Sequence, residues 1–133
     1  MKTKKYKVLI VDDEPALRNM LSSLLSSAGH LCYTAADGIE ALKKTEREYF
    51  DAVITDVVMP NMDGIALTKE LLKRNPSLAV AVMTGFSNQY TAEDVKAVGA
   101  SDFLNKTFAI SDLCTRFAEM MRDHESRRQA ASD

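Results

Sequence analysis

Five polar residues stand at or just beyond the ends of short apolar segments, where parallel strands of a sheet would end. Three carry carboxylates, one a hydroxyl and one an ammonium group: Asp12, Asp13, Asp56, Thr84 and Lys106. Clustered carboxylates repel one another, and a hard divalent cation such as Mg²⁺, which prefers oxygen ligands, relieves that repulsion. Mg²⁺ and Lys106 together would balance the three negative charges. Such a field suits phosphoryl transfer, with the Asp56 carboxylate as the accepting nucleophile.

The apolar segments are short and nearly continuous, as expected for parallel strands that are buried on both faces. They comprise residues 6–11, 31–35, 52–55, 78–83 and 103–105. Between them, apolar residues recur at helical spacing, and turn residues mark the helix ends. Pro15 suits a first turn, Gly29 suits a helix end, and Thr91 with Asp94 resembles a capping box. The predicted helices span residues 15–28, 39–47, 65–74 and 91–98, with a fifth from about residue 111.

This alternation predicts an α/β domain with the doubly wound (βα)5 architecture of flavodoxin-like folds. Right-handed crossovers would place helices on both faces of a five-stranded parallel sheet, which we expect in the order 2-1-3-4-5. Ligands of such sheets bind beyond the carboxyl ends of the strands, which lie about 4.8 Å apart. Asp12 and Asp13 would then lie on one side of Asp56 and Thr84 on the other. The long side chain of Lys106 could reach inward from the outer strand.

Length and charge limit the classes of protein to which the chain can belong. Its 133 residues suit one ordinary domain, and 46% apolar with 27% charged residues is close to average globular composition. A formal net charge of −2 gives no basic face for general binding to nucleic acid. The apolar runs are far shorter than the roughly 20 residues of a membrane helix, and none suits a signal peptide. We therefore expect a soluble, cytoplasmic protein.

The apolar pattern ends at Met121, and the residues after it are polar. We assign residues 1–122 to the folded domain and residues 123–133 to a polar tail or a truncated linker. Cys32 and Cys114 lie far apart in the sequence without CxxC spacing. We interpret them as free thiols rather than as a metal or redox pair.

Four motifs, each at the end of a predicted strand, resemble those of two-component response regulator receiver domains. They are VDDEP at residues 11–15, DVVMPNMDG at residues 56–64, MTG at residues 83–85 and GASDFLNK at residues 99–106. Each motif alone has little specificity, but four in this order at strand ends are a specific match. The resemblance spans about residues 5–122 and implies the fold of the chemotaxis-regulator-like receivers.

The resemblance implies that Asp56 accepts a phosphoryl group from a sensor histidine kinase or a histidine phosphotransfer protein. It implies Mg²⁺ as the cofactor, with Asp13 and Asp56 as direct ligands. Asp12 would act largely through water, and the backbone carbonyl of Val58 would be the third protein ligand. Lys106 would pair with the phosphoryl group.

The resemblance also implies a switch that reports phosphorylation. Thr84 would move to hydrogen-bond the phosphoryl group, and Phe103 would turn inward on activation. The output would be a population shift of the surface formed by residues 91–98, residues 103–105 and the last helix. A homodimer could form through the same surface. No direct binding of nucleic acid or of a membrane is implied for this chain.

Two features of this chain modify the expected chemistry. The matching lysine of the family is usually followed by proline, whereas Thr107 follows Lys106. A cis bond before a residue other than proline costs about 2.5–4 kcal/mol, against roughly 0.5–1 kcal/mol before proline, which favours a trans bond here. Val58 and Phe86 match positions of the family at which side chains help or hinder the water that hydrolyses the phosphoryl group. Because neither can orient water by hydrogen bonding, we expect slow self-dephosphorylation.

Two alternative functions stay open at the level of sequence. A degenerate receiver acting only as a docking module has Thr107 as its sole support. An Mg²⁺ phosphatase of the haloacid dehalogenase type, with an aspartate nucleophile, would need an Asp-x-Asp pair and a capping insert. Here Asp12 and Asp13 are adjacent and no insert is present. Neither GxxxxGK[ST] nor GxGxxG occurs, so a nucleotide-binding module is unsupported. The resemblance to receiver domains implies a phosphoacceptor protein rather than an enzyme.

Overall fold

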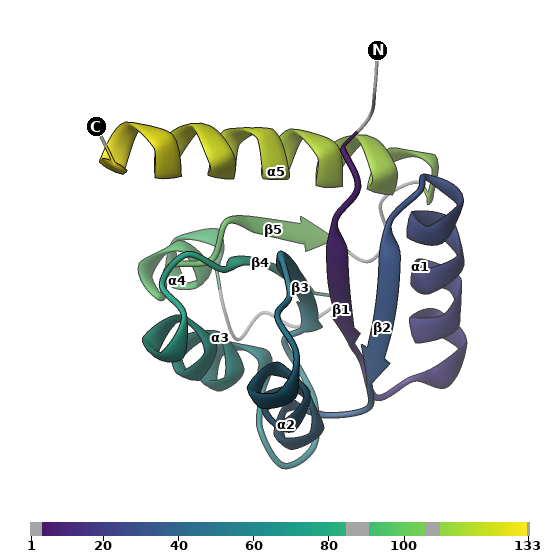
Figure 1. Ribbon diagram of the computed structural model, residues 1–133. Coiled ribbons are helices and arrows are strands. Elements are labelled where there is room, and N and C mark those ends of the chain that lie inside the picture. Colours follow the sequence, from purple (N-terminus) through teal and green to yellow (C-terminus); the bar gives the residue numbers. More distant parts are fainter. Residues whose placement is uncertain (1–3, 85–90, 106–109, 133) are drawn as a thin grey trace.

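Five parallel strands in the order β2-β1-β3-β4-β5 form the sheet of the computed structural model, which describes residues 4–84, 91–105 and 110–132 (Figure 1). The strands are β1 (Lys7–Val11), β2 (Leu31–Ala35), β3 (Ala52–Asp56), β4 (Ala79–Thr84) and β5 (Asp102–Asn105). The helices are α1 (Pro15–Ser27), α2 (Gly38–Arg47), α3 (Gly64–Arg74), α4 (Ala92–Ala97) and α5 (Ile110–Ser132). The predicted fold class and strand order are confirmed, with strand ends displaced by one residue at most.

Side chains alternate between the two faces of the sheet, and each face carries its own core. Leu9 and Val11 of β1 belong to a core cluster shared with α2, α3 and α4. Val8 and Ile10 belong to a second cluster shared with α1 and α5. All four side chains are fully buried, so β1 is apolar along its whole length because both of its faces are covered.

The helix starts use the capping residues that the sequence offers. Pro15 occupies the first turn of α1. Asp37 and Asp63 cap α2 and α3, and each accepts a hydrogen bond at 2.8 Å from the backbone N–H three residues later. Thr91 and Asp94 form the predicted capping box at the start of α4. These caps place the start of each helix beyond the carboxyl end of the preceding strand.

The last helix, α5, continues through residue 122 and runs past the amino-terminal ends of the strands (Figure 1). Its His124 Nε2 lies 2.6 Å from the carbonyl oxygen of Ser77, just before β4. Its Glu125 accepts a hydrogen bond at 2.9 Å from Lys4, just before β1. The division at residue 122 stays a prediction, although these contacts join the following turn to the fold. None of the described helices has both the length and the apolar character needed to cross a membrane.

Candidate functional site

Three carboxylates meet at the carboxyl-terminal edge of the sheet. Asp12 and Asp13 follow β1, and Asp56 is the last residue of the neighbouring strand β3. Each of the three offers an oxygen, and these oxygens lie within 4.8 Å of one another. Asp12 is fully buried and Asp56 is 5% exposed, whereas Asp13 is exposed to solvent. The structure therefore brings together the three residues that the strand-end pattern selected.

Local hydrogen bonds orient two of these carboxylates. Asp12 Oδ1 accepts a hydrogen bond at 2.9 Å from the backbone N–H of Glu14. Asp56 Oδ1 accepts one at 3.4 Å from the backbone N–H of Val58. In each case the donor lies two residues after the aspartate, as in an Asx turn, so the chain folds back over the carboxylate at the strand end. Val58 is 55% exposed and does not belong to the core.

The loop after β3 returns close to the main chain of Asp56. The backbone N–H of Gly64 donates a 2.7 Å hydrogen bond to the carbonyl oxygen of Val57. A Cβ atom on Gly64 would lie 2.1 Å from the carbonyl oxygen of Asp56, which is an impossible contact. Only glycine permits the start of α3 to approach Asp56 this closely, so the Asp63–Gly64 pair both caps α3 and closes the loop.

Two further residues singled out in the sequence lie on the strands next to Asp56. Thr84 ends β4, where Met83 is the ladder partner of Asp56, and its side chain is largely buried. Phe103 pairs with Val82 across β4 and β5 and packs, partly buried, against the core cluster under α4. Thr84 is thus one residue beyond Asp56 on the adjacent strand, and Phe103 is one strand farther out.

The family model of the response regulator receiver domain matches residues 8–118, which is most of the chain. This chain belongs to the response regulator receiver domain family. It is 33% identical over 122 residues to the DNA-binding transcriptional regulator NtrC of Escherichia coli, covering 92% of this chain and 26% of NtrC. It is 32% identical over 119 residues to the alkaline phosphatase synthesis transcriptional regulatory protein PhoP of Bacillus subtilis, covering 90% of this chain and 50% of PhoP.

Solved structures of related receivers share the fold. The chemotaxis protein CheY4 of Vibrio cholerae superposes with a TM-score of 0.81 at 34% identity, over 88% of this chain and 99% of CheY4. NtrX of Brucella abortus superposes with a TM-score of 0.89 at 29% identity, over 96% of this chain and 30% of NtrX. This receiver chain thus spans nearly the whole of CheY4 but at most half the length of NtrC, PhoP and NtrX.

Three predictions for this receiver fall on residues outside the described part of the chain. They concern the ammonium group of Lys106, the apolar side chain of Phe86 and the peptide bond between Lys106 and Thr107. The part of the site built by β1, β3 and β4 lies entirely within the described residues.

The donor set of this receiver fits a hard cation. In the described part of the chain, Asp12, Asp13 and Asp56 form the one group of at least three potential ligands close enough to share an ion. All of their donor atoms are carboxylate oxygens, which Mg²⁺ prefers, and no cysteine or histidine takes part. The exposure of Asp13 leaves one side of the cluster open to water, which suits an ion that retains several of its waters.

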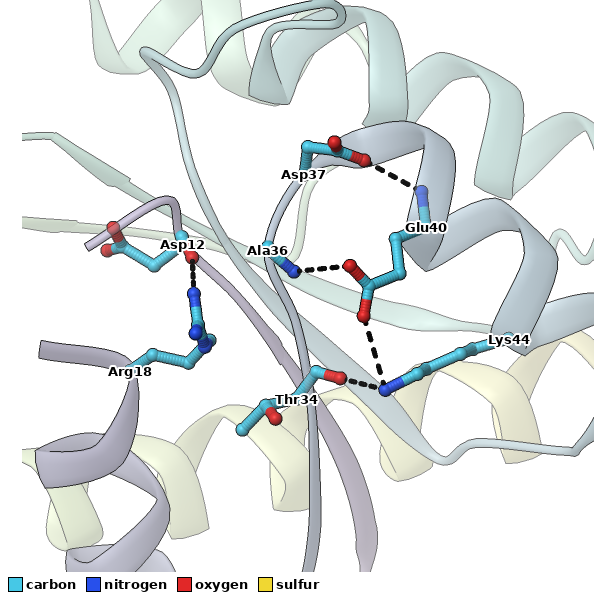
Figure 2. A network of polar contacts seen from close by, with 7 residues as sticks. All are labelled: Asp12, Arg18, Thr34, Ala36, Asp37, Glu40 and Lys44. Atoms are coloured by element: carbon cyan, nitrogen blue, oxygen red, sulfur yellow. Dashed lines mark hydrogen bonds and ion pairs between the residues drawn. The ribbon is translucent and has the colours of Figure 1, made fainter. Parts of the chain in front are cut away.

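One contact near the carboxylates was not anticipated. Arg18 of α1 donates a hydrogen bond at 2.7 Å from Nη1 to the backbone carbonyl of Asp12 (Figure 2). Arg18 is the only charged residue of α1, a signal that could have drawn attention to it. Sequence alone does not indicate which oxygen it binds, because the acceptor is a main-chain atom on the preceding loop.

Proposed function

We propose that this receiver accepts a phosphoryl group on Asp56 and that phosphorylation controls its output. The supporting observation is the group of three carboxylates, whose oxygens lie within 4.8 Å of one another at the ends of β1 and β3. The donor would be a phosphohistidine of a sensor histidine kinase or of a histidine phosphotransfer protein. We place the reaction in the cytoplasm and regard the chain as a phosphoacceptor rather than as a classical enzyme.

The proposed transfer forms one bond and breaks one bond. A carboxylate oxygen of Asp56 attacks phosphorus while the P–N bond of the phosphohistidine breaks, and the imidazole leaves with the bonding electrons. The backbone N–H of Val58, at 3.4 Å from Oδ1, biases the rotation of the Asp56 carboxylate. Because Asp56 is 5% exposed, few orientations of the donor bring phosphorus to it.

Asp12, Asp13, Asp56 and the backbone carbonyl of Val58 would hold Mg²⁺, with Asp12 acting largely through water. Bound there, Mg²⁺ would neutralise the negative charge that gathers where a phosphoryl group meets three carboxylates. Asp12 is fully buried and oriented by Glu14, so its carboxylate is already placed toward the cluster. Asp13, which is exposed, would complete the ligand set from the solvent side.

Thr84, Lys106 and Phe103 would convert the phosphoryl group into a change of surface. We propose that Lys106 pairs with the group, that Thr84 hydrogen-bonds it, and that Phe103 turns inward as Thr84 moves. Thr84 ends the strand beside Asp56, and Phe103 is already partly buried against the α4 side of the core. The surface that changes is formed by α4, β5 and α5, and a homodimer through it is part of the proposal.

The phosphoryl group should be lost slowly once the donor is removed. Val58, two residues after Asp56, is 55% exposed, and its side chain offers no hydrogen bond to a water molecule. Phe86 would act in the same way from the segment after β4. The decay of the phosphorylated mass after removal of the donor measures this lifetime, and rapid decay would contradict the expectation.

Incubation with acetyl phosphate and Mg²⁺, followed by intact mass spectrometry, tests the proposal. We expect a gain of one phosphoryl group in the natural chain and no gain in Asp56→Asn. The matched control is Asp123→Asn, the same substitution at an exposed position on α5, which should be phosphorylated like the natural chain. Omission of Mg²⁺ should abolish the gain.

Other results would favour the alternative functions. If neither the natural chain nor Asp56→Asn gains a phosphoryl group, the proposal is wrong and a degenerate receiver acting as a docking module is favoured. If the natural chain rapidly hydrolyses many equivalents of acetyl phosphate, an aspartate-nucleophile phosphatase is favoured. Retention of the phosphoryl group in Asp56→Asn would assign the acceptor to another residue.

A further inference from the structure

The main chain of Asp12 is held from both sides. Its N–H donates a hydrogen bond at 3.2 Å to the carbonyl of Ala35 on β2. Its carbonyl oxygen accepts one at 2.7 Å from Nη1 of Arg18, which reaches back from α1 (Figure 2). Its carboxylate accepts one at 2.9 Å from the backbone N–H of Glu14. A fully buried residue of the candidate metal site is thus fixed by partners on three different segments.

The Arg18 bond acts on the peptide that leads into Asp13. The strand ladder of β1 ends at Val11, which pairs with Ala35 on β2 and Thr55 on β3. The peptide between Asp12 and Asp13 therefore lies beyond the sheet. Because a peptide unit is planar, fixing the Asp12 carbonyl also fixes the direction of the Asp13 N–H and the position of its Cα.

The acceptor of the Asp12 N–H is itself supported. The peptides on either side of Ala35 bind α2: the Thr34 carbonyl accepts from Lys44 Nζ, and the Ala36 N–H donates to Glu40 Oε2 at 3.2 Å. Glu40 and Lys44 form an ion pair with Oε1 and Nζ 3.5 Å apart (Figure 2). Hydrogen bonds therefore connect the end of β2, which binds the Asp12 N–H, to α2. The bond from Arg18 connects the Asp12 carbonyl to α1.

Two effects of Arg18 on a bound cation oppose each other. Its guanidinium is always charged, so it lowers the negative potential of the cluster and disfavours a second cation. Its hydrogen bond reduces the conformational freedom that Asp12 and Asp13 would lose on binding. Salt screens the first effect and leaves the second, so ionic strength separates the two.

We propose that Arg18 is a positioning residue that holds Asp12 and Asp13 in the arrangement that binds Mg²⁺. This inference rests on the proposed function, because it assumes that the three carboxylates bind the ion. Arg18 itself touches neither the ion nor the phosphoryl group. The positioning effect exceeds the repulsion of the charge, because a hydrogen bond from a charged donor to a buried carbonyl is among the stronger ones.

The test is isothermal titration of Mg²⁺ into the natural chain, Arg18→Met and Arg18→Lys at about 0.05 M and about 0.5 M KCl. We expect Arg18→Met to bind Mg²⁺ roughly tenfold more weakly at the higher salt and less than tenfold more weakly at the lower salt. Arg18→Lys should recover part of the loss. Amide exchange at Glu14, whose N–H binds the Asp12 carboxylate, should quicken in Arg18→Met.

Arg74→Met is the matched control, because Arg74 pairs with Glu46 and Glu70 at the end of α3 that lies away from Asp56. Its Mg²⁺ affinity should equal that of the natural chain. The inference is overturned if Arg18→Met, shown to be folded by circular dichroism, binds Mg²⁺ as tightly as the natural chain at the higher salt. If Arg18→Met does not fold, the same criterion applies to Arg18→Ala, which also removes both the charge and the hydrogen-bond donor. Absence of Mg²⁺ binding by the natural chain would overturn the proposed function together with this inference.

Discussion

Gly64 faces the carbonyl oxygen of the residue that we propose as the phosphoacceptor. Its neighbour Asp63 caps α3, and its own N–H bonds the carbonyl of Val57. The absence of a side chain is what permits α3 to begin directly against the end of β3. Gly64 therefore serves two purposes: it is the first residue of α3, and its lack of a side chain leaves room for the main chain of Asp56.

Gly64→Ala should therefore disturb both the fold and the site. The added Cβ would lie 2.1 Å from the Asp56 carbonyl oxygen, so the loop or the strand end must move. We expect the free energy of unfolding in urea to fall by about 1–3 kcal/mol and phosphorylation by acetyl phosphate to slow. Gly38→Ala is the control, since the nearest atoms to its Cβ would be side-chain atoms of Met62 at 3.0–3.1 Å, a much milder contact than 2.1 Å to a backbone oxygen. Equal losses in the two variants would contradict the explanation.

Among the elements, α5 continues beyond the end of the apolar pattern at Met121. The polar sequence after Met121 suggested a tail, yet the helix continues and its polar residues find partners before β1 and β4. His124 lies between the segments before β4 and β5: its Nε2 is 2.6 Å from the Ser77 carbonyl, and its Nδ1 is 3.4 Å from Ser101 Oγ. A polar helical turn can thus belong to a fold when it meets exposed backbone groups rather than an apolar core.

His124→Ala should lower the stability of the domain through this element. The substitution removes the bond to the Ser77 carbonyl and the contact with Ser101, for which we expect a loss of about 1 kcal/mol in the free energy of unfolding. The control is Asp123→Ala, an exposed neighbour on the same helix that undergoes a similar change in helix propensity. Urea unfolding of both variants decides, and equal stabilities would show that the His124 contacts contribute nothing.

At the scale of the whole molecule, the proposed phosphorylation site and the contacts of α5 with the segments before the strands lie at opposite edges of the sheet. The carboxylates occupy the carboxyl-terminal edge, while Tyr6, His30 and Phe117 join β1, β2 and α5 near the amino-terminal edge. The His30 ring lies 4.9 Å from that of Phe117 and 5.7 Å from that of Tyr6. Burial first, and then the hydrogen bond to Glu125, raise the pKa of Tyr6 to about 12.

The stability of the molecule should depend on the charge of His30. Its Nδ1 accepts a hydrogen bond at 3.1 Å from the N–H of Tyr6, and burial lowers its pKa. The unfolded state therefore binds more protons than the folded state below about pH 6.5, the ordinary pKa of histidine. We expect the free energy of unfolding to be fully maintained above that pH and to decrease as the pH falls through it.

Urea unfolding of the natural chain and of His30→Gln between about pH 5 and pH 7.5 measures this dependence. Glutamine offers an acceptor for the Tyr6 N–H and does not titrate, so the variant should show a shallower loss of stability at low pH. Parallel curves for the two proteins would show that another group causes the acid sensitivity.

Much of this architecture was predictable because it depends on periodic patterns. Runs of apolar residues mark the strands, Asp63 and Thr91 mark helix starts, and parallel strands must bring their carboxyl ends to one edge. That geometry places Asp12, Asp13 and Asp56 together without any knowledge of side-chain contacts. The extent of α5 could not be predicted in this way, since its last turns are held by polar contacts that leave no apolar periodicity.

By itself, the sequence determined the order of the elements, the two buried faces of β1 and the acidic edge, because these follow from residue type and spacing along the chain. Only the tertiary structure decided that Arg18 binds the Asp12 carbonyl, that Gly64 touches the Asp56 main chain and that His124 meets Ser77. In each of these contacts one partner is a backbone atom. Because every residue has the same backbone carbonyl group, residue types do not indicate which carbonyl a given side chain or glycine will contact.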